Sequence, residues 1–383
     1  FTNITDQLLE ALKREKLIEV KSAQQGGLGE GSFVYGITGA GILRAREALQ
    51  RSQYAGPAPV PLEIYYEAIR RQARQKTAVT DSVLRQTLSG LVLNERTLER
   101  IGPAINSGTS IFLYGPPGNG KTTIARAIGE LVLQDTMYIP YAFYIDGQVV
   151  TLYDTVNHRS ANEALTNRVK TGSLRSGHRR DPRWVLIHRP FIVVGGELNM
   201  EGLDLVFDET NKFYEAPFQV KANGGILLID DFGRQHVRPR DLLNRWIVPL
   251  ENRIDYLTLH TGRKVEVPFD VLVVFSTNLP PRDLVDEAFL RRLRHKIEIG
   301  DPSFDEYREI FKRAAAAHGI PFNPSGLAYL LQEWYIRRGR KLRASHPRDL
   351  CDQILDIANY LKIEAEMTND LINRAAESYF VEL

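Results

Sequence analysis

The segment from Ser110 to Leu133 constrains the fold of this chain more than any other part of its sequence. A short apolar run, Ser110–Tyr114, is followed by the loop Gly115-Pro116-Pro117-Gly118-Asn119-Gly120-Lys121-Thr122 and then by helix-forming residues. The loop fits G-x-x-x-x-G-K-[ST] between a strand and a helix, which is the setting of a phosphate-binding loop. Glycines let backbone N–H groups turn toward phosphate oxygens, and the helix N-terminus attracts negative charge. The segment predicts an α/β fold that binds a nucleotide.

We expect the loop and the residue after it to bind ATP. Lys121 is placed to reach the β- and γ-phosphates, and the hydroxyl of Thr122 is placed to bind Mg²⁺. The alternative, a chance glycine-rich turn, does not account for the flanking strand and helix. The expected nucleotide-binding residues in this segment are Gly115, Pro116, Pro117, Gly118, Asn119, Gly120, Lys121, Thr122 and Thr123.

A second apolar run, Gly224–Ile229, ends in two carboxylates, Asp230 and Asp231. Acids rarely close a buried strand unless a cation or a water molecule needs them. We expect Asp230 to hold Mg²⁺ and Asp231 to polarise the attacking water as general base. The alternative is a helix cap at the strand end.

Hydrophobic periodicity divides the chain into parts. From Ser110 to about residue 302, strands alternate with helices, which predicts a parallel sheet flanked by helices in an α/β domain spanning 62–302. This domain is expected to begin, ahead of the sheet, with helices at 62–76, 80–90 and 95–106. After it, amphipathic patterns at 303–318, 324–337, 346–362 and 367–380 predict a helical lid domain, 303–383.

Residues 1–52 read as helix, strand, glycine-rich tip, strand and helix, which resembles part of a winged-helix module. The proline-rich stretch 53–61 reads as a stiff linker after it.

Three further segments carry a family resemblance. The apolar strand Val271–Phe275 ends in Ser276-Thr277-Asn278, paired arginines Arg291 and Arg292 precede the strand His295–Ile299, and Pro347-Arg348 opens a helix. In this order after the phosphate loop and the acidic strand, they resemble the AAA+ ATPase family over about residues 85–383.

The resemblance implies roles for these residues. Asn278 matches the family's sensor 1, which positions the attacking water, and Arg348 matches sensor 2, which contacts the nucleotide. Arg292 resembles the arginine finger that reaches the nucleotide of an adjacent subunit, with Arg291 as its runner-up. The family's second acid is usually glutamate, so Asp231 is one methylene short. The resemblance also implies a homo-oligomer, usually a hexameric ring, with ATP/ADP and Mg²⁺ as cofactors.

Two inserts refine the resemblance. A helix is expected over 241–250. Residues 255–267, which follow it, read as a hairpin with Thr261-Gly262 at its turn, similar to the branch of MoxR-type chaperones and enhancer-binding activators. A β-rich insert is expected at about 155–220, with a second hairpin formed by Phe191–Val194 and Leu203–Phe207. Within it, residues 168–183 hold six Lys/Arg against one Asp, a local charge of +5. Phe213 and Tyr214 either grip a polypeptide or pack against the insert.

Composition leaves the partner open. The net charge is +2, so charge alone does not imply a polyanionic partner. The chain has one cysteine, Cys351, so the fold does not depend on an internal disulfide. No apolar run is long enough to cross a bilayer and no secretory signal is present, so we expect a cytoplasmic protein without membrane insertion. Three hypotheses stand. The first is a chaperone-like ATPase that remodels a protein client. The second is a nucleic-acid-dependent ATPase, such as a loader, a translocase or a transcription regulator, that uses the winged-helix-like module, and the third is a nucleotide-gated scaffold with little turnover.

Overall fold

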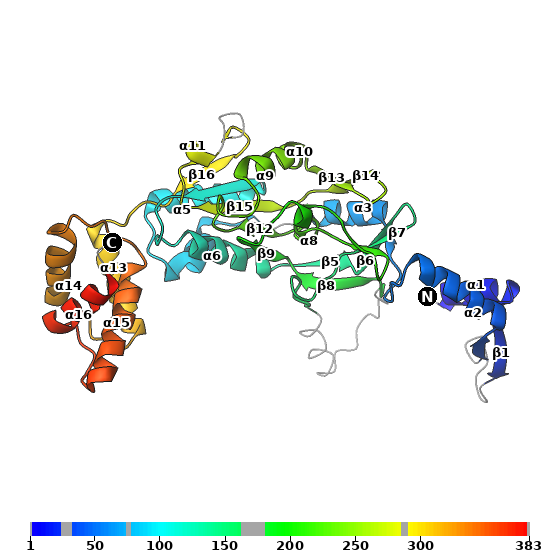
Figure 1. Ribbon diagram of the computed structural model, residues 1–383, viewed down its shortest axis with the longest axis horizontal. Coiled ribbons are helices and arrows are strands. Elements are labelled where there is room, and N and C mark those ends of the chain that lie inside the picture. Colours follow the sequence, from blue (N-terminus) through cyan, green and yellow to red (C-terminus); the bar gives the residue numbers. More distant parts are fainter. Residues whose placement is uncertain (1, 24–32, 74–77, 162–180, 285–289, 381–383) are drawn as a thin grey trace.

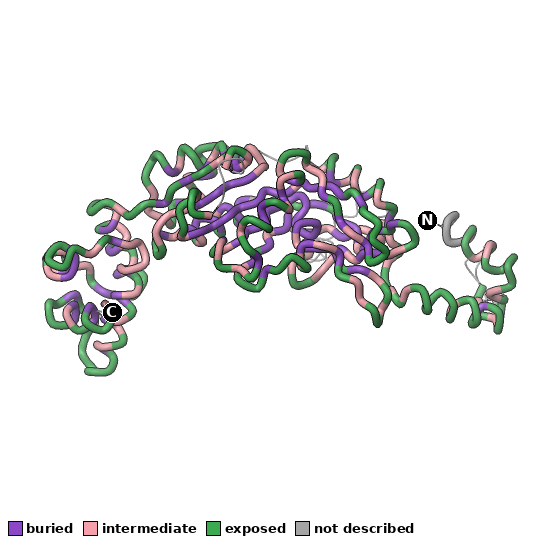
Figure 2. The backbone as a smooth tube through the Cα atoms, turned by 45° about the horizontal axis from the view of Figure 1, so that its top comes forward, coloured by how far each residue is buried: buried purple, intermediate pink, exposed green. Residues whose placement is uncertain are grey.

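The computed structural model describes residues 2–23, 33–73, 78–161, 181–284 and 290–380. The molecule is elongated, with a central α/β body between a helical region at the C-terminal end and a small module at the N-terminal end (Figure 1). Most buried residues lie in the central body and in the helical region (Figure 2). The predicted class, a parallel sheet flanked by helices with a helical C-terminal part, is confirmed.

A five-stranded parallel sheet forms the centre of the body. Its strand order is β16 (His295–Glu298), β4 (Ser110–Tyr114), β15 (Leu272–Thr277), β12 (Ile226–Ile229) and β9 (Phe191–Val194). Ile229 pairs with Phe275, and Thr277 pairs with Tyr114. The predicted phosphate loop and acid pair therefore leave the same edge of the sheet, on either side of β15.

Helices cover both faces of this sheet because its strand residues alternate between them. On one face, α4 (Asp81–Thr87), α5 (Glu95–Ser107) and α6 (Lys121–Leu133) pack on strand residues such as Ile111 and Leu228. On the other, α9 (Pro239–Arg245) and α10 (Ile247–Asn252) pack on strand residues such as Leu227. The phosphate loop is thus held between a buried strand and a buried helix.

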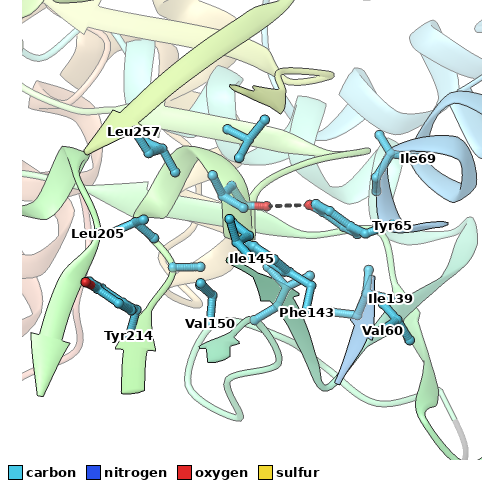
Figure 3. Close-up of a cluster of buried hydrophobic side chains, with 14 of the residues drawn as sticks. Val60, Tyr65, Ile69, Ile139, Phe143, Ile145, Val150, Leu205, Tyr214 and Leu257 are labelled. Carbon is cyan, nitrogen blue, oxygen red and sulfur yellow. Dashed lines mark hydrogen bonds between the residues drawn. The ribbon is translucent and has the colours of Figure 1, made fainter. Parts of the chain in front are cut away.

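A second, mixed sheet lies beside the first. Its order is β10 (Val206–Asp208), β11 (Phe213–Glu215), β7 (Gln148–Thr151), β6 (Ala142–Ile145) and β3 (Val60–Pro61). The end of the proline-rich stretch is therefore a strand, and Val60 is fully buried. The sheet shares a core with α3 (Leu62–Ala73), where Tyr65 stacks on Phe143 with ring centroids 5.1 Å apart (Figure 3).

Two short antiparallel pairs complete the body: β5 (Thr136–Pro140) with β8 (Trp184–His188), and β13 (Ile254–Thr258) with β14 (Lys264–Pro268). The second pair confirms the predicted hairpin. Tyr214 is fully buried, so it packs inside the protein rather than gripping a polypeptide. The basic stretch falls mostly outside the described residues; at its end, Arg183 pairs with Asp181.

Two local predictions are wrong. Phe191–Val194 and Leu203–Phe207 do not form a hairpin, because β9 pairs in parallel with β12 at the edge of the central sheet, while β10 pairs with β11 in the second sheet. The helix expected over 241–250 is interrupted at Trp246. Pro249 has no N–H to continue the bonding of the first helix, and the chain restarts as α10.

The N-terminal module contains α1 (Thr2–Arg14), β1 (Ile18–Ala23), β2 (Phe33–Ile37) and α2 (Gly39–Arg51), in the predicted order. Gly41 is the only buried residue among 6–22 and 33–51.

The C-terminal region contains α13 (Phe304–Ala317), α14 (Pro324–Leu330), α15 (His346–Leu361) and α16 (Asn369–Tyr379) around its own core. Residues Leu331–Ile336 continue α14 as a π-helix. Cys351 is fully buried in this core, as its small apolar character predicts.

Candidate nucleotide site

The phosphate loop connects β4 to α6, and its glycines lie at positions where a side chain would clash or strain the backbone. At Gly115 the backbone φ is +143°, and a Cβ atom there would lie 2.2 Å from the carbonyl oxygen of Ile299. Gly118 has a φ of +79°, in the left-handed region that L side chains rarely adopt. The loop thus has the tight backbone path that its sequence predicts.

Lys121 lies at the start of α6 with its ammonium group turned back into the loop. The Nζ atom donates to the carbonyl oxygens of Gly115 and Pro116 over 2.9 and 2.8 Å. Burial lowers the pKa of Lys121, and the nearby carboxylates Asp231 and Asp230 oppose this effect. The contacts leave a positive charge at the place where a bound phosphate would neutralise it.

Thr122 and Asp230 come together from the two sides of β15. The hydroxyl of Thr122 donates to Oδ1 of Asp230 over 2.9 Å. A hydroxyl and a carboxylate oxygen are hard ligands that suit Mg²⁺, which takes few protein ligands and completes its shell with phosphate and water. No group of three or more His, Cys, Asp or Glu side chains that could hold a metal ion occurs among the described residues.

Asp231 and Asn278 lie at the ends of neighbouring strands. The side-chain amide of Asn278 donates to Oδ1 of Asp231 over 3.2 Å. Two further bonds join the strand ends: Phe232 N–H to the Ser276 carbonyl over 2.7 Å, and the Thr277 hydroxyl to the Phe232 carbonyl over 2.7 Å. Asp231 has a φ of +49°, a costly conformation for a residue with a side chain. The two strand ends therefore place the Asp231 carboxylate beside the Asn278 amide.

These groups surround one cavity of about 420 Å³ between the central sheet and the C-terminal region. Of the predicted residues, those from Pro117 to Thr123 line it, together with Asp231, Asn278 and Arg348. Gly115 and Pro116 line a neighbouring cavity of about 550 Å³, which Asn278 also borders. Asp230 lines neither cavity and contacts the site through its hydrogen bond with Thr122. A volume of this order suits a cofactor-sized ligand.

Sequence reasoning missed one end of the cavity. The backbone turn Gly90–Leu93, with Ile310 and Arg313 of α13, lines the end formed by the preceding helices and the C-terminal region. Arg313 also bonds the carbonyl oxygen of Ser89 over 2.7 Å. These residues carry no motif and come from segments far apart in sequence, so no local signal could have found them.

The three predicted arginines are placed differently. Arg348, in the first turn of α15, lines the cavity, keeps 70% of its side chain exposed and pairs with Asp349 over 3.1 Å. Arg292 pairs with Glu251 over 2.6 Å, and Arg291 is exposed. Neither Arg291 nor Arg292 belongs to the residues that line the cavity. Their expected action on an adjacent subunit stays a prediction.

Comparisons with known proteins give little beyond this geometry. A domain family of unknown function, DUF8689, matches residues 303–378, which is the C-terminal helical region alone. No curated protein matches. No described helix is long and apolar enough to span a membrane.

Solved structures resemble the chain at low identity. NtrX from Brucella abortus in complex with ATP aligns with 16% identity and a TM-score of 0.42, over 87% of this chain and 60% of that one. The RuvB Holliday junction branch migration motor of Thermotoga maritima aligns with 17% identity and a TM-score of 0.40, over 78% and 70%. This chain thus spans less than two thirds of the NtrX length. Similarity at this level does not assign a family or an activity.

Proposed function

We propose that this chain binds ATP with Mg²⁺ in the cavity and hydrolyses it to ADP and phosphate, as an ATPase of the AAA+ type. The observation that carries the proposal is the convergence of the phosphate loop, Asp231, Asn278 and Arg348 on one cavity. These residues come from four separate segments of the chain, and all four segments line the same cavity.

The residues divide the chemistry between them. The loop amides and Lys121 would hold the phosphates, and Thr122 and Asp230 would hold Mg²⁺, which shields charge on the β- and γ-phosphates. Asp231 would accept the proton of the attacking water, and Asn278 would keep that water and the carboxylate in line. Arg348 would stabilise charge that develops on the γ-phosphoryl oxygens as the bond to the leaving ADP breaks.

The assembly is part of the proposal. Arg292 would act on the nucleotide of a second copy of this chain, in a ring that is usually hexameric in the family the sequence resembles. The half-buried position of Arg292 beside Glu251 supports a residue held in a fixed direction rather than a freely solvated charge. A cytoplasmic location stays a prediction.

For the partner on which the ATPase acts, remodelling of a protein client is our first candidate. The hairpin β13–β14 supports it, because this hairpin is the feature similar to MoxR-type chaperones and enhancer-binding activators. The second hairpin expected in the insert does not form, so it gives this candidate no support.

A specific observation favours nucleic acid as the second candidate. Arg234, Arg238 and Arg240 follow directly after the acid pair, are exposed, and form no salt bridge with any other described residue. Arginines suit phosphate groups because their planar fork donates two parallel hydrogen bonds.

Phosphate release from ATP tests the proposed activity. Wild-type protein should release phosphate with Mg²⁺ and stop when the metal is chelated, and Asp231→Ala should bind ATP without turning it over. Absence of turnover in wild-type protein, with ATP bound, would support the nucleotide-gated scaffold instead.

Turnover with and without DNA, at two salt concentrations, separates the partner classes. Strong stimulation that falls with salt and is lost in Arg234→Gln/Arg238→Gln/Arg240→Gln supports nucleic acid. The control Arg70→Gln/Arg96→Gln/Arg308→Gln removes three exposed arginines elsewhere. Turnover indifferent to DNA leaves the protein client, which the ATP-loaded Asp231→Ala variant should trap.

A further inference from the structure

We infer that Asn119 is a positioning residue that fastens the C-terminal helical region to the phosphate loop, through Asp301 and the segment Arg343–Ser345. Neither the sequence motif nor the residue's place in the loop assigns this role. The contact itself is independent of the proposed function, whereas its effect on ATP turnover rests on that function.

Asn119 is buried, with 5% of its surface exposed, although it lies in a loop that must admit a ligand. Its side-chain amide donates to Oδ1 of Asp301 over 2.9 Å. Its side-chain oxygen accepts from the backbone N–H of Ala344 over 3.2 Å. The side-chain amide of Asn119 therefore bonds residues outside the loop, in two segments that are more than 180 positions away in the chain.

The neighbouring residue adds a third bond. The carbonyl oxygen of Gly118 accepts from the N–H of Ser345 over 2.8 Å. The approach is close, since a Cβ atom at Gly118 would lie 2.8 Å from Oγ of Ser345. Two adjacent residues of the loop thus bond two adjacent residues of the C-terminal region, Ala344 and Ser345.

Asp301 completes the arrangement. It lies between β16 and α13, in the connection that carries the chain from the sheet into the helical region. Its carboxylate also pairs with the guanidinium of Arg343. Asn119 therefore contacts both the start of the helical region and its inner loop, and a rotation that carries Arg343–Ser345 away from the phosphate loop must break the bonds to Ala344 and Ser345.

The bonded segment leads directly into the site. Ser345 directly precedes α15, whose first turn contains Arg348, three residues after Ser345. Among the described residues the Arg348 side chain bonds only its neighbour Asp349, so its position over the cavity depends on where Ser345 is fixed. Asn119 thus acts on Arg348 indirectly, through the backbone of Ala344 and Ser345.

Hydrogen exchange in nucleotide-free protein tests the contact. The amides of peptide 341–348 should be protected in wild-type protein and should exchange on the order of tenfold faster in Asn119→Ala, since the N–H of Ala344 loses its acceptor and the bond from the N–H of Ser345 to Gly118 loses its support. Asn323→Ala is the control, because Asn323 caps α14 in the same region without contacting the loop. Equal exchange in Asn119→Ala and wild-type protein would overturn the inference.

An exchange of groups tests the pairing more strictly. Asn119→Asp places two carboxylates face to face and should open peptide 341–348 further than Asn119→Ala does. The double variant Asn119→Asp/Asp301→Asn restores a carboxylate opposite an amide and should recover most of the protection. If the double variant exchanges as fast as Asn119→Asp, Asp301 is not the partner and the inference fails.

ATP turnover tests the consequence. Asn119→Ala should lower kcat/KM for ATP about tenfold, the Asn119→Asp/Asp301→Asn variant should recover part of it, and Asn323→Ala should change neither. Unchanged turnover in Asn119→Ala would contradict the link to Arg348. If wild-type protein shows the expected exchange pattern but binds no ATP, the proposed function is wrong and the contact stands.

Discussion

The hydroxyl of Thr122 lies 2.9 Å from the carboxylate of Asp230, although 108 positions separate the two residues in the chain. One comes from the first turn of α6 and the other from the end of β12, so the parallel sheet brings them to a common edge. The pair offers Mg²⁺ one hydroxyl and one carboxylate oxygen and leaves the rest of its shell to phosphate and water.

Replacing either residue should weaken Mg²⁺ binding and leave the stability of the fold nearly unchanged. We expect Thr122→Val and Asp230→Asn each to raise the Mg²⁺ concentration for half-maximal ATP turnover by at least about tenfold. A Mg²⁺ titration of phosphate release measures this. Thr151→Val, which loses a hydroxyl in the second sheet, is the control. A metal dependence equal to that of wild-type protein in both variants would exclude the pair as the Mg²⁺ site.

Asp231 and Asn278 should separate binding from hydrolysis. Asp231→Asn keeps the shape of the side chain but accepts no proton, so kcat should fall by about 10²–10⁴ while ATP still binds. Asn278→Ala should lower kcat less, because the carboxylate remains and only its orientation is lost. Rapid-quench measurement of a single turnover isolates the chemical step, and a normal rate in Asp231→Asn would assign the proton to another group.

Arg292 should act between subunits. We expect Arg292→Ala to bind ATP and hydrolyse it poorly, and mixing it with Asp231→Ala subunits to restore part of the activity, because some interfaces then combine an intact arginine with an intact acid. Glu251→Gln removes the ion-pair partner and tests whether the effect is only loss of that pair. No recovery on mixing, over a range of subunit ratios, would contradict an arginine donated by a neighbour.

His346 should make the C-terminal region sensitive to acid. Burial lowers its pKa to about 4, against an ordinary value of 6.5, with Arg343 and Arg340 acting in the same direction and Asp349 and Asp301 opposing them. The unfolded chain therefore takes up a proton near pH 6.5, whereas the folded chain does so only near pH 4. The contribution of His346 to stability is complete above about pH 6.5 and is lost as the pH falls toward 4.

Urea denaturation at pH 7.5 and 5.0 measures this effect. His346→Gln should lose stability at pH 7.5, because the ring packs on Tyr379 and Phe380, but it should fall less than wild-type protein between the two pH values. An equal fall in both proteins would mean that other groups carry the acid sensitivity.

Local patterns predicted the parts of this fold that depend on neighbours in sequence. The helices of the C-terminal region appear where the apolar spacing places them, and Ser110–Tyr114 and Ile226–Ile229 are strands as expected. The phosphate loop needs only its own glycines, and the acid pair needs only the end of its own strand. These elements could therefore be placed from the sequence alone.

Features that depend on distant partners could not be placed in this way. Phe191–Val194 looks the same in sequence whether it closes a local hairpin or joins β12, and the choice is made by pairing across the sheet. The cavity end at Gly90–Leu93 and Arg313 exists only because α13 returns to the core. Asn119 fits the motif as any residue would, and its bonds to Asp301 and Ala344 appear only in the folded chain.

Binding of ATP by the purified chain, measured by titration calorimetry with Mg²⁺, tests the central claim most directly. We predict that wild-type protein binds the nucleotide and that Lys121→Ala, which loses the ammonium group in the phosphate loop, binds it at least about 100-fold more weakly. Wild-type protein that binds no adenine nucleotide, or a Lys121→Ala variant that binds it equally well, would contradict the account.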